Sequence, residues 1–256
     1  MWCGRFPFFV RIMRKYIAFS YDAVYSGGVP AGEAKSPVRR KGKFAMFRFQ
    51  KKEVIICFLA VFGMGFFLSF LILCNLGTDP ATFMNRSGAA RIGLSFGTWQ
   101  LIVNAVMLAV VFAFKRSLIG FGTVFNMVLV GYYADFFDWL WGKCIPAKAF
   151  TAPVSRWAIF LVALLCFIIS AAVYINADMG VAPYDGLPII LTEKVTAHFP
   201  KVPPMIVRIA WDGAAIGVGT ALGGTPIIGI ILMALFLGPA ISLVRRIGGK
   251  NSSETP

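Results

Sequence analysis

The stretch "IVRIAWDGAA" carries two opposite charges in an apolar run, and their spacing suits an ion pair or a binding site. Arg208 and Asp212 are four residues apart, so on a helix they share one face. A charged side chain at the centre of a bilayer costs about 3 kcal/mol, and it therefore needs a partner or a purpose. One interpretation is an ion pair within the helix. The other is that Arg208 binds an anionic group of a substrate while Asp212 holds the guanidinium in place.

Two further polar segments interrupt apolar runs, and each contains glycine, proline and at least one carboxylate. The first, "CNLGTDPATF", includes Asn75 and Asp79, and the second, "NADMGVAPYDGLPIIL", includes Asp178 and Asp185. Aspartate before proline predicts that Asp79 caps a new helix, and Asp185 offers a similar cap for a helix that follows it. A helix N-terminus exposes unpaired N–H groups at the positive end of its dipole. The two segments are either surface loops or short helices that enter the bundle and form a site.

Other polar residues add little chemistry to this set. Asn104 lies in an apolar run, where an amide either bonds across helices or binds a ligand. Five cysteines without CxxC spacing and a single histidine, His198, predict no metal site and no cofactor. The chain has neither HExxH nor GxSxG, so we expect no enzymatic activity. The candidate substrate-binding residues are therefore Asn75, Asp79, Asn104, Asp178, Asp185, Arg208 and Asp212.

The composition predicts that these residues are carried by membrane helices. Hydrophobic residues make up 58% of the 256, charged residues 14%, and the mean hydropathy is +0.76, whereas a soluble domain carries about 25% charged residues. A helix needs about 20 apolar residues to cross the hydrocarbon layer, where its backbone must be satisfied internally. We therefore predict an all-α, polytopic membrane helix bundle with six transmembrane helices, at about 54–75, 98–114, 118–140, 157–177, 205–222 and 224–244.

The distribution of basic residues predicts the orientation and argues against a nucleic-acid partner. The net charge is +14, but twelve of the 25 Lys and Arg residues precede Glu53. Basic residues that flank a first span are typical of a cytoplasmic anchor attracted to anionic lipid. With residues 1–53 as a flexible cytoplasmic extension, most remaining Lys and Arg also fall on the inner side. Both termini, including the tail 247–256, are then cytoplasmic, and membrane lipid is the expected partner.

The two polar segments also indicate an internal repeat. When they are aligned, Gly77 matches Gly180 and Pro80 matches Pro183 at the same offset of 103 residues. The chain then divides into three-helix repeats at 54–141 and 157–246, joined by an external linker at 142–156. Because three is odd, the second repeat is inverted relative to the first. Inverted repeats with short broken or re-entrant segments are common in secondary transporters, where substrate sites lie between the repeats.

Several motifs resemble a known family. "NLGTDPATF…GLSFGTWQLIVNAVML" and "NADMGVAPYDGLPIILTEK" are similar to bacterial YczE/YyaS/YitT-type membrane proteins, in particular the YczE-like branch. Its "G…D" element is represented by Gly131 and Asp135, and its "G-x-x-P-x-D-G" turn begins at Gly180. The resemblance covers about residues 54–246. It differs in the first turn, where the acid precedes the proline. The resemblance implies an integral protein of the bacterial plasma membrane and implies little about chemistry.

Two functions fit these features. The first is a small secondary transporter or exporter of a small polar solute, bound between the two inverted repeats. Helix N-termini and Arg208 favour an anionic group, and the carboxylates favour a cation or an amine, which together are compatible with a zwitterion. The alternative is a non-transporting membrane subunit, which captures substrate or regulates a partner protein. The chain has no Walker A sequence, so in that case ATP use would belong to the partner.

Overall fold

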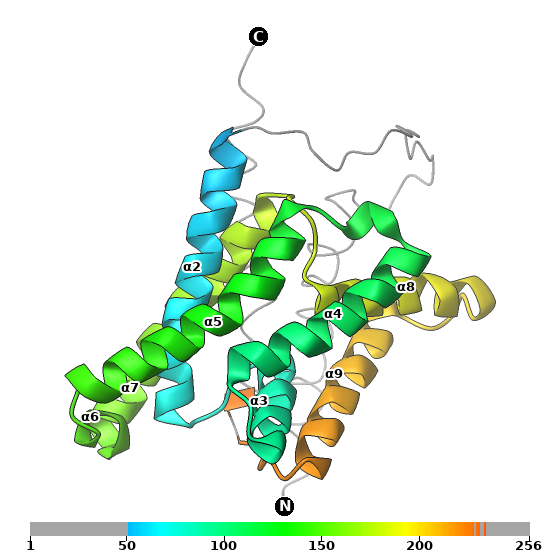
Figure 1. The fold of residues 1–256 in the computed structure, drawn as a ribbon. Helices are drawn as coiled ribbons and strands as arrows, with labels where there is room; N and C mark the ends of the chain where they lie inside the picture. The colour runs from blue at the N-terminus through cyan, green and yellow to red at the C-terminus, as the bar shows by residue number, and fades with distance from the viewer. Residues whose placement is uncertain (1–50, 228, 231–232, 234–256) are drawn as a thin grey trace, which may run out of the picture.

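The computed structural model describes residues 51–227, 229–230 and 233, and within these residues all regular secondary structure is helical (Figure 1). The chain forms long helices joined by short turns. In chain order they are α2 (Lys51–Cys74), α3 (Pro80–Ile92), α4 (Phe96–Phe114), the 3₁₀ turn η1 (Arg116–Leu118), α5 (Phe121–Cys144), α6 (Lys148–Thr151), α7 (Pro153–Asn176), α8 (Pro183–His198) and α9 (Pro204–Ala221). The predicted all-α class is confirmed for the described part of the chain.

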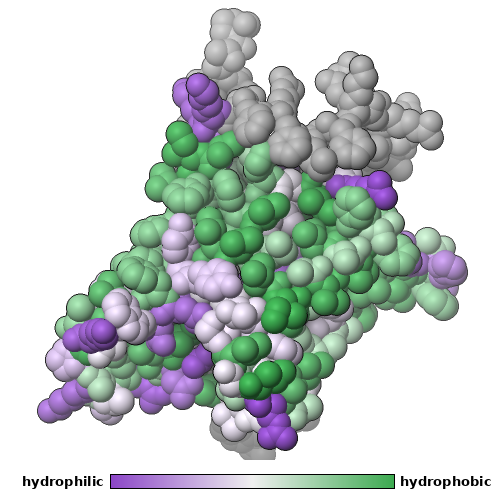
Figure 2. All heavy atoms as spheres, in the orientation of Figure 1, coloured by the Kyte–Doolittle hydropathy of each residue, from purple (hydrophilic) through white to green (hydrophobic). Residues whose placement is uncertain are grey.

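Three of the described helices, α2, α4 and α7, are long and apolar enough to cross a membrane. They match the predicted spans 54–75, 98–114 and 157–177. Their exposed side chains are largely aliphatic and aromatic, as lipid contact requires. Figure 2 shows such apolar residues over much of the visible face, with hydrophilic residues gathered toward its ends.

The other predicted spans stand differently. Helices α5 and α9 occupy the predicted spans 118–140 and 205–222, but polar residues interrupt both, and a crossing by either one stays a prediction. Most of the predicted span 224–244 lies outside the described residues, and residues 1–50 and the tail lie wholly outside them. The count of six spans and their inverted arrangement therefore also stay predictions.

Helix α2 lies between α5 and α7 and forms the centre of the core (Figure 1). Leu68 and Leu71 of α2 and Phe160 of α7 are almost fully buried. Ser69, a buried polar residue of this core, is paired, since the indole Nε1 of Trp141 donates a hydrogen bond to its Oγ at 3.0 Å. A satisfied polar group of this kind avoids the cost of burying an unpaired donor.

The "GTW" and "G…D" motifs meet where α4 begins against α5. The backbones approach so closely that a Cβ atom on Gly131 would lie 2.7 Å from Gly97 Cα. Asp135 Oδ2 accepts a hydrogen bond from Gly97 N at 2.8 Å. Asp135 thus satisfies one of the unpaired N–H groups at the start of α4 and places a negative charge at the positive end of its dipole.

The two polar segments have the same backbone conformation after α2 and after α7. After each helix the chain passes through the left-handed backbone conformation, which Gly and Asn adopt most readily. A proline then begins the next helix. The equivalent positions are Asn75 and Asp178 with φ of 46° and 49°, Gly77 and Gly180 with φ of 123° and 105°, and Pro80 and Pro183 at the first residues of α3 and α8. We call these segments, residues 75–79 and 178–182, the first and second breaks.

Each break forms a backbone hydrogen bond with a segment far away in the sequence. Met179 O in the second break accepts from Gly122 N at the start of α5, at 2.7 Å, and Leu76 O in the first break accepts from Gly229 N at 2.9 Å. The helices that follow the breaks are also enclosed, because α3 packs against α9 and α8 packs against α4. The breaks are therefore integrated into the bundle.

The end of α2 is tied to the start of α7 by one side chain. Arg156 Nε donates to Cys74 O at 2.6 Å, and its Nη2 donates to Asn75 O at 2.8 Å. These carbonyls would otherwise lack partners at a helix C-terminus, which also favours a positive charge. The segment 142–156, predicted as an external linker, is largely helical, and its place outside the membrane stays a prediction. Helix α5 continues to Cys144, α6 fills the middle, and the proline at residue 153 starts α7, so Arg156 is helical.

Candidate functional site

Three of the predicted site residues meet where α8 contacts α9. Arg208 Nε pairs with Asp212 Oδ2 at 2.9 Å, one turn further along α9, which confirms the predicted ion pair. Arg208 Nη1 also pairs with Asp185 Oδ1 at 2.8 Å, and this residue lies in the first turn of α8. We call Asp185, Arg208 and Asp212 the ion cluster. It joins two helices through one guanidinium.

Tyr184 completes the surroundings of the ion cluster and was missed by the sequence analysis. Its hydroxyl donates to Asp212 Oδ1 at 2.8 Å, and the Arg208 Cζ atom lies 5.7 Å from its ring centroid, within cation–π range. Trp211 lies beside this ring, with centroids 5.5 Å apart. In the sequence, the one indication of their role is position, because Tyr184 and Trp211 each directly precede an acid of the cluster.

The ion cluster is half-buried. The side chains of Arg208, Asp212 and Asp185 are 26%, 22% and 39% exposed. Asp79 lies near enough for its charge to interact with that of Asp185. Among the described residues, the two carboxylates of Asp185 and Asp212 share one guanidinium, which leaves an excess of negative charge in the cluster. A site of this kind attracts protons or cations.

The two predicted caps turned out differently. Asp79 is the N-cap of α3, and its Oδ1 accepts from Thr82 N at 3.0 Å, as expected. The cap predicted for Asp185 is wrong, because α8 begins earlier, at Pro183, with Ala182 as its N-cap. The reason is the fixed φ of proline, which suits the first helical position. Asp185 lies in the first turn instead, where its carboxylate is free to reach Arg208.

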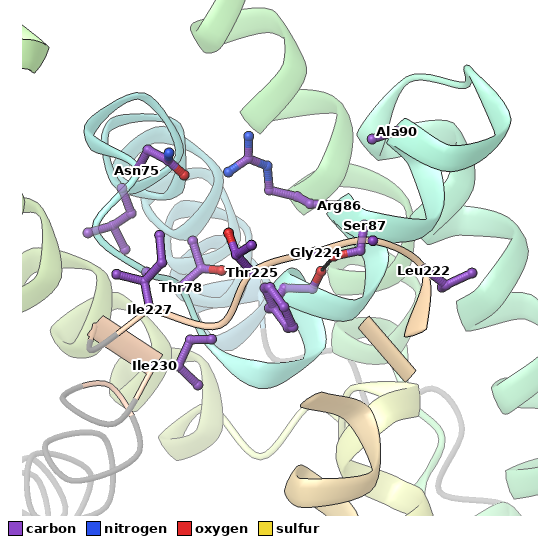
Figure 3. A pocket seen from close by; sticks show the side chains of 14 residues that line it. Asn75, Thr78, Arg86, Ser87, Ala90, Leu222, Gly224, Thr225, Ile227 and Ile230 are labelled. Carbon is purple, nitrogen blue, oxygen red and sulfur yellow. Dashed lines mark hydrogen bonds between the residues drawn. The ribbon is translucent and has the colours of Figure 1, made fainter. Parts of the chain in front are cut away.

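A cavity of about 220 Å³ lies beside the first break (Figure 3). It is bounded by the end of α2, by α3 and by the segment that follows α9, so it joins two distant parts of the chain. Arg86 is the charged residue of its described lining. The lining residues are Leu71, Asn75, Gly77, Thr78, Phe83, Arg86, Ser87, Ala90, Leu222, Gly223, Gly224, Thr225, Ile227 and Ile230.

The remaining predicted residues do not join the ion cluster. Asn75 lines the cavity, and Asp178 is exposed at the equivalent position of the second break. Asn104 is buried on α4, with no hydrogen bond to the cluster in the described part of the chain. Arg86, which was not among the predicted site residues, lines the cavity from α3. The described residues contain no group of three or more His, Cys, Asp or Glu side chains that could hold a metal ion.

Comparisons with known proteins agree with the helical membrane character. The family described as "Family of unknown function (DUF6198)" matches residues 51–246, which include every described helix. The "Uncharacterized membrane protein YczE" of Bacillus subtilis (strain 168) is 29% identical over 175 residues, which cover 66% of this chain and 77% of that protein. "Uncharacterized protein YyaS" of the same organism is 25% identical over 180 residues, covering 66% and 85%.

A third relative, an "Uncharacterized protein" of Haemophilus influenzae (strain ATCC 51907 / DSM 11121 / KW20 / Rd), is 22% identical over 195 residues, which cover 75% of this chain and 83% of that protein. No solved structure matches. These relatives confirm the resemblance to YczE-like proteins, and the naming of YczE as a membrane protein is consistent with the long apolar helices of this chain.

Proposed function

The chain belongs to the family of unknown function DUF6198, and we propose that this member is a small secondary transporter of a small polar solute. The observation that carries the proposal is the half-buried ion cluster of Asp185, Arg208 and Asp212. Charges within a membrane protein are costly and tend to line ion or substrate pathways. Buried ion pairs also contribute little to stability compared with apolar packing. A role in moving a solute gives this cluster a purpose that folding alone does not.

The second part of the proposal is that residues 54–141 and 157–246 are inverted copies of one three-helix unit. Three observations support it: the shared backbone conformation of the breaks, their reciprocal hydrogen bonds, and the matched packing of α3 with α9 and α8 with α4. Arg156, which ties the end of α2 to the start of α7, supports opposite directions for these helices. In inverted repeats, solute sites lie between the copies at broken helices. Both termini are then on the cytoplasmic side of a bacterial plasma membrane.

The third part of the proposal is that protons drive transport, which the excess of carboxylates in the cluster favours. Asp185 is its most exposed carboxylate and holds α8 to α9 through Arg208. In this proposal a proton held by the cluster weakens the pairing with Arg208 that joins α8 to α9, so α8 can move relative to α9. Loss of the proton on the other side of the membrane restores the pair. The solute itself undergoes no bond making or breaking in this proposal.

The test is proton movement in liposomes that contain the purified protein and an internal pH-sensitive dye. A panel of amino acids, small carboxylates and small amines is added outside in turn. We expect at least one solute to drive proton movement, and Asp185→Asn or Arg208→Gln to abolish it. Glu193→Gln is the matched control, because it removes a carboxylate from the same helix, where Glu193 pairs with Lys115 and is 57% exposed.

Unchanged proton movement in correctly inserted Asp185→Asn protein would reject the site. If no solute drives proton movement and a second protein copurifies stably, the chain is better described as a membrane subunit that serves a partner. Insertion is checked by the yield of monodisperse protein in detergent for each variant.

A further inference from the structure

The cavity beside the first break has a polar wall that the ion cluster does not explain. One side of its wall comes from residues 71–90 and the other from residues 222–230. Figure 3 shows Asn75, Thr78, Arg86 and Thr225 around it. The volume of about 220 Å³ gives room for several water molecules or one small organic molecule. Its position between distant parts of the chain is typical of ligand pockets.

The charge in this wall is Arg86, and its donors are available. No described residue accepts a hydrogen bond from the Arg86 guanidinium, although its charge interacts with that of Asp138. A guanidinium carries five N–H donors in a planar fork. Leaving such donors unsatisfied in a half-buried place costs free energy. The fork therefore requires water or an acceptor within the cavity.

The neighbouring groups suit a carboxylate better than a cation. The described lining contains no acid. The hydroxyl of Ser87 already donates its proton to Phe83 O at 2.9 Å, so the side-chain donors that remain beside Arg86 are the hydroxyl of Thr225 and the amide of Asn75. Arginine binds planar carboxylates with two parallel hydrogen bonds, a geometry that lysine cannot reproduce.

We propose that this cavity binds the carboxylate group of a small soluble solute, with Arg86 as the residue that recognises it. This inference rests on the proposed function, because it names the class of solute that is transported. The solute is then an anion or a zwitterion. Its negative charge is bound at Arg86, and the proton that accompanies it is held at the ion cluster.

The first experiment measures binding in detergent by thermal stabilisation and by calorimetry. The probes are lactate, succinate, L-alanine and L-glutamate, with ethanolamine as a cationic control and inorganic phosphate as a non-carboxylate anion. We expect at least one carboxylate to stabilise the protein and ethanolamine to have no effect. Arg86→Gln should weaken the Kd by about tenfold or more, Arg86→Lys should restore part of the affinity, and Arg91→Gln, which removes an exposed charge from the same helix, should leave it unchanged.

Two results would overturn the proposal. One is that none of the four carboxylates stabilises the wild-type protein. The other is that Arg86→Gln binds the active carboxylate as tightly as the wild type does. Because removal of Arg86 also affects the charge beside Asp138, the variant could fail to fold, and a second measurement is needed that keeps Arg86 in place.

That measurement uses Ala90, an exposed residue of the cavity wall. Ala90→Cys is introduced into protein with Cys3→Ser and Cys144→Ser, and its reaction with negative and positive thiol reagents is timed. We expect the negative reagent to react several-fold faster than the positive one, and the active carboxylate to slow the reaction. Equal rates for the two reagents, without protection, would also overturn the proposal.

An anionic group in the cavity could belong to a soluble carboxylate or to a lipid headgroup, and changing the lipid distinguishes the two. Ala90→Cys protein is compared in nanodiscs of phosphatidylcholine and of phosphatidylglycerol. Protection by phosphatidylglycerol alone, with no effect of soluble carboxylates, would assign the cavity to a lipid headgroup and reject the solute. Carboxylate binding without proton movement would sustain this inference while rejecting transport. Solute-driven proton movement that is unchanged in Arg86→Gln would sustain transport and reject Arg86 as the residue that recognises the solute.

Discussion

Removing Arg208 tests whether the ion cluster is a coupled unit. Arg208→Gln breaks two hydrogen-bonded ion pairs, at 2.8 and 2.9 Å, and leaves both carboxylates without their partner. Loss of one partner of a fully buried pair costs about 3–5 kcal/mol, whereas an exposed pair is worth about 0.2–1 kcal/mol. The side chains of the cluster are 22–39% exposed, so we expect an intermediate loss of about 2 kcal/mol in the free energy of unfolding.

A double-mutant cycle separates the pair from other effects. Asp212→Asn should cost about 1 kcal/mol, because Arg208 keeps its pair with Asp185. The double variant should cost about 2 kcal/mol and not the sum of the two single changes, which gives a coupling energy of about 1 kcal/mol. Unfolding is followed by circular dichroism during titration with SDS in mixed micelles.

The matched control is the pair formed by Lys115 and Glu193, whose side chains are 28% and 57% exposed. Lys115→Gln should cost only about 0.5 kcal/mol, because this pair is the more solvated one. If the effects of Arg208→Gln and Asp212→Asn add to within about 0.3 kcal/mol, the two residues do not act on each other, and the reasoning that places them in one cluster is refuted.

Three other changes test the elements that surround the sites. Asp135→Ala removes the side chain that accepts from Gly97 N and should lower the free energy of unfolding by about 1 kcal/mol, measured by the same titration, while Asp135→Asn should recover part of it. Gly131→Ala places a Cβ atom 2.7 Å from Gly97 Cα and should cost about 1–3 kcal/mol; an unchanged midpoint would contradict the close contact of α4 and α5. Arg156→Gln removes two hydrogen bonds to the end of α2 and should cost about 2 kcal/mol, with faster amide hydrogen exchange at residues 74–76 as the local measure.

Local patterns in the sequence predicted the breaks well. The spacing of Gly77 and Pro80 relative to Gly180 and Pro183 indicated two equivalent turns, and the backbone has the same conformation in both. This succeeds because positive φ and a proline at a helix start are restricted to few residue types. The cap at Asp79 was predicted for the same reason.

Contacts between helices that are distant in the chain could not be predicted from residue spacing. Arg208 and Asp212 share a helix, so their pairing follows from spacing, but nothing in the spacing shows that Asp185 reaches the same guanidinium. Arg86 was not predicted as a site residue, because its 13-residue helix has mixed polarity and no clear apolar period. Its place in a cavity depends on how α3 packs against α9, which is a property of the whole bundle.

The paired docking of the breaks has a consequence for how the chain is made. Within the described residues Leu76 O accepts its hydrogen bond from Gly229 N, so the turn after the first long helix stays incomplete until most of the polypeptide has left the ribosome. Fragments cut between α5 and α7 would each keep an orphan carbonyl in apolar surroundings, at Leu76 in one and at Met179 in the other. If the two fragments are encoded as separate polypeptides, they should therefore be recovered intact only when both are produced in the same cell.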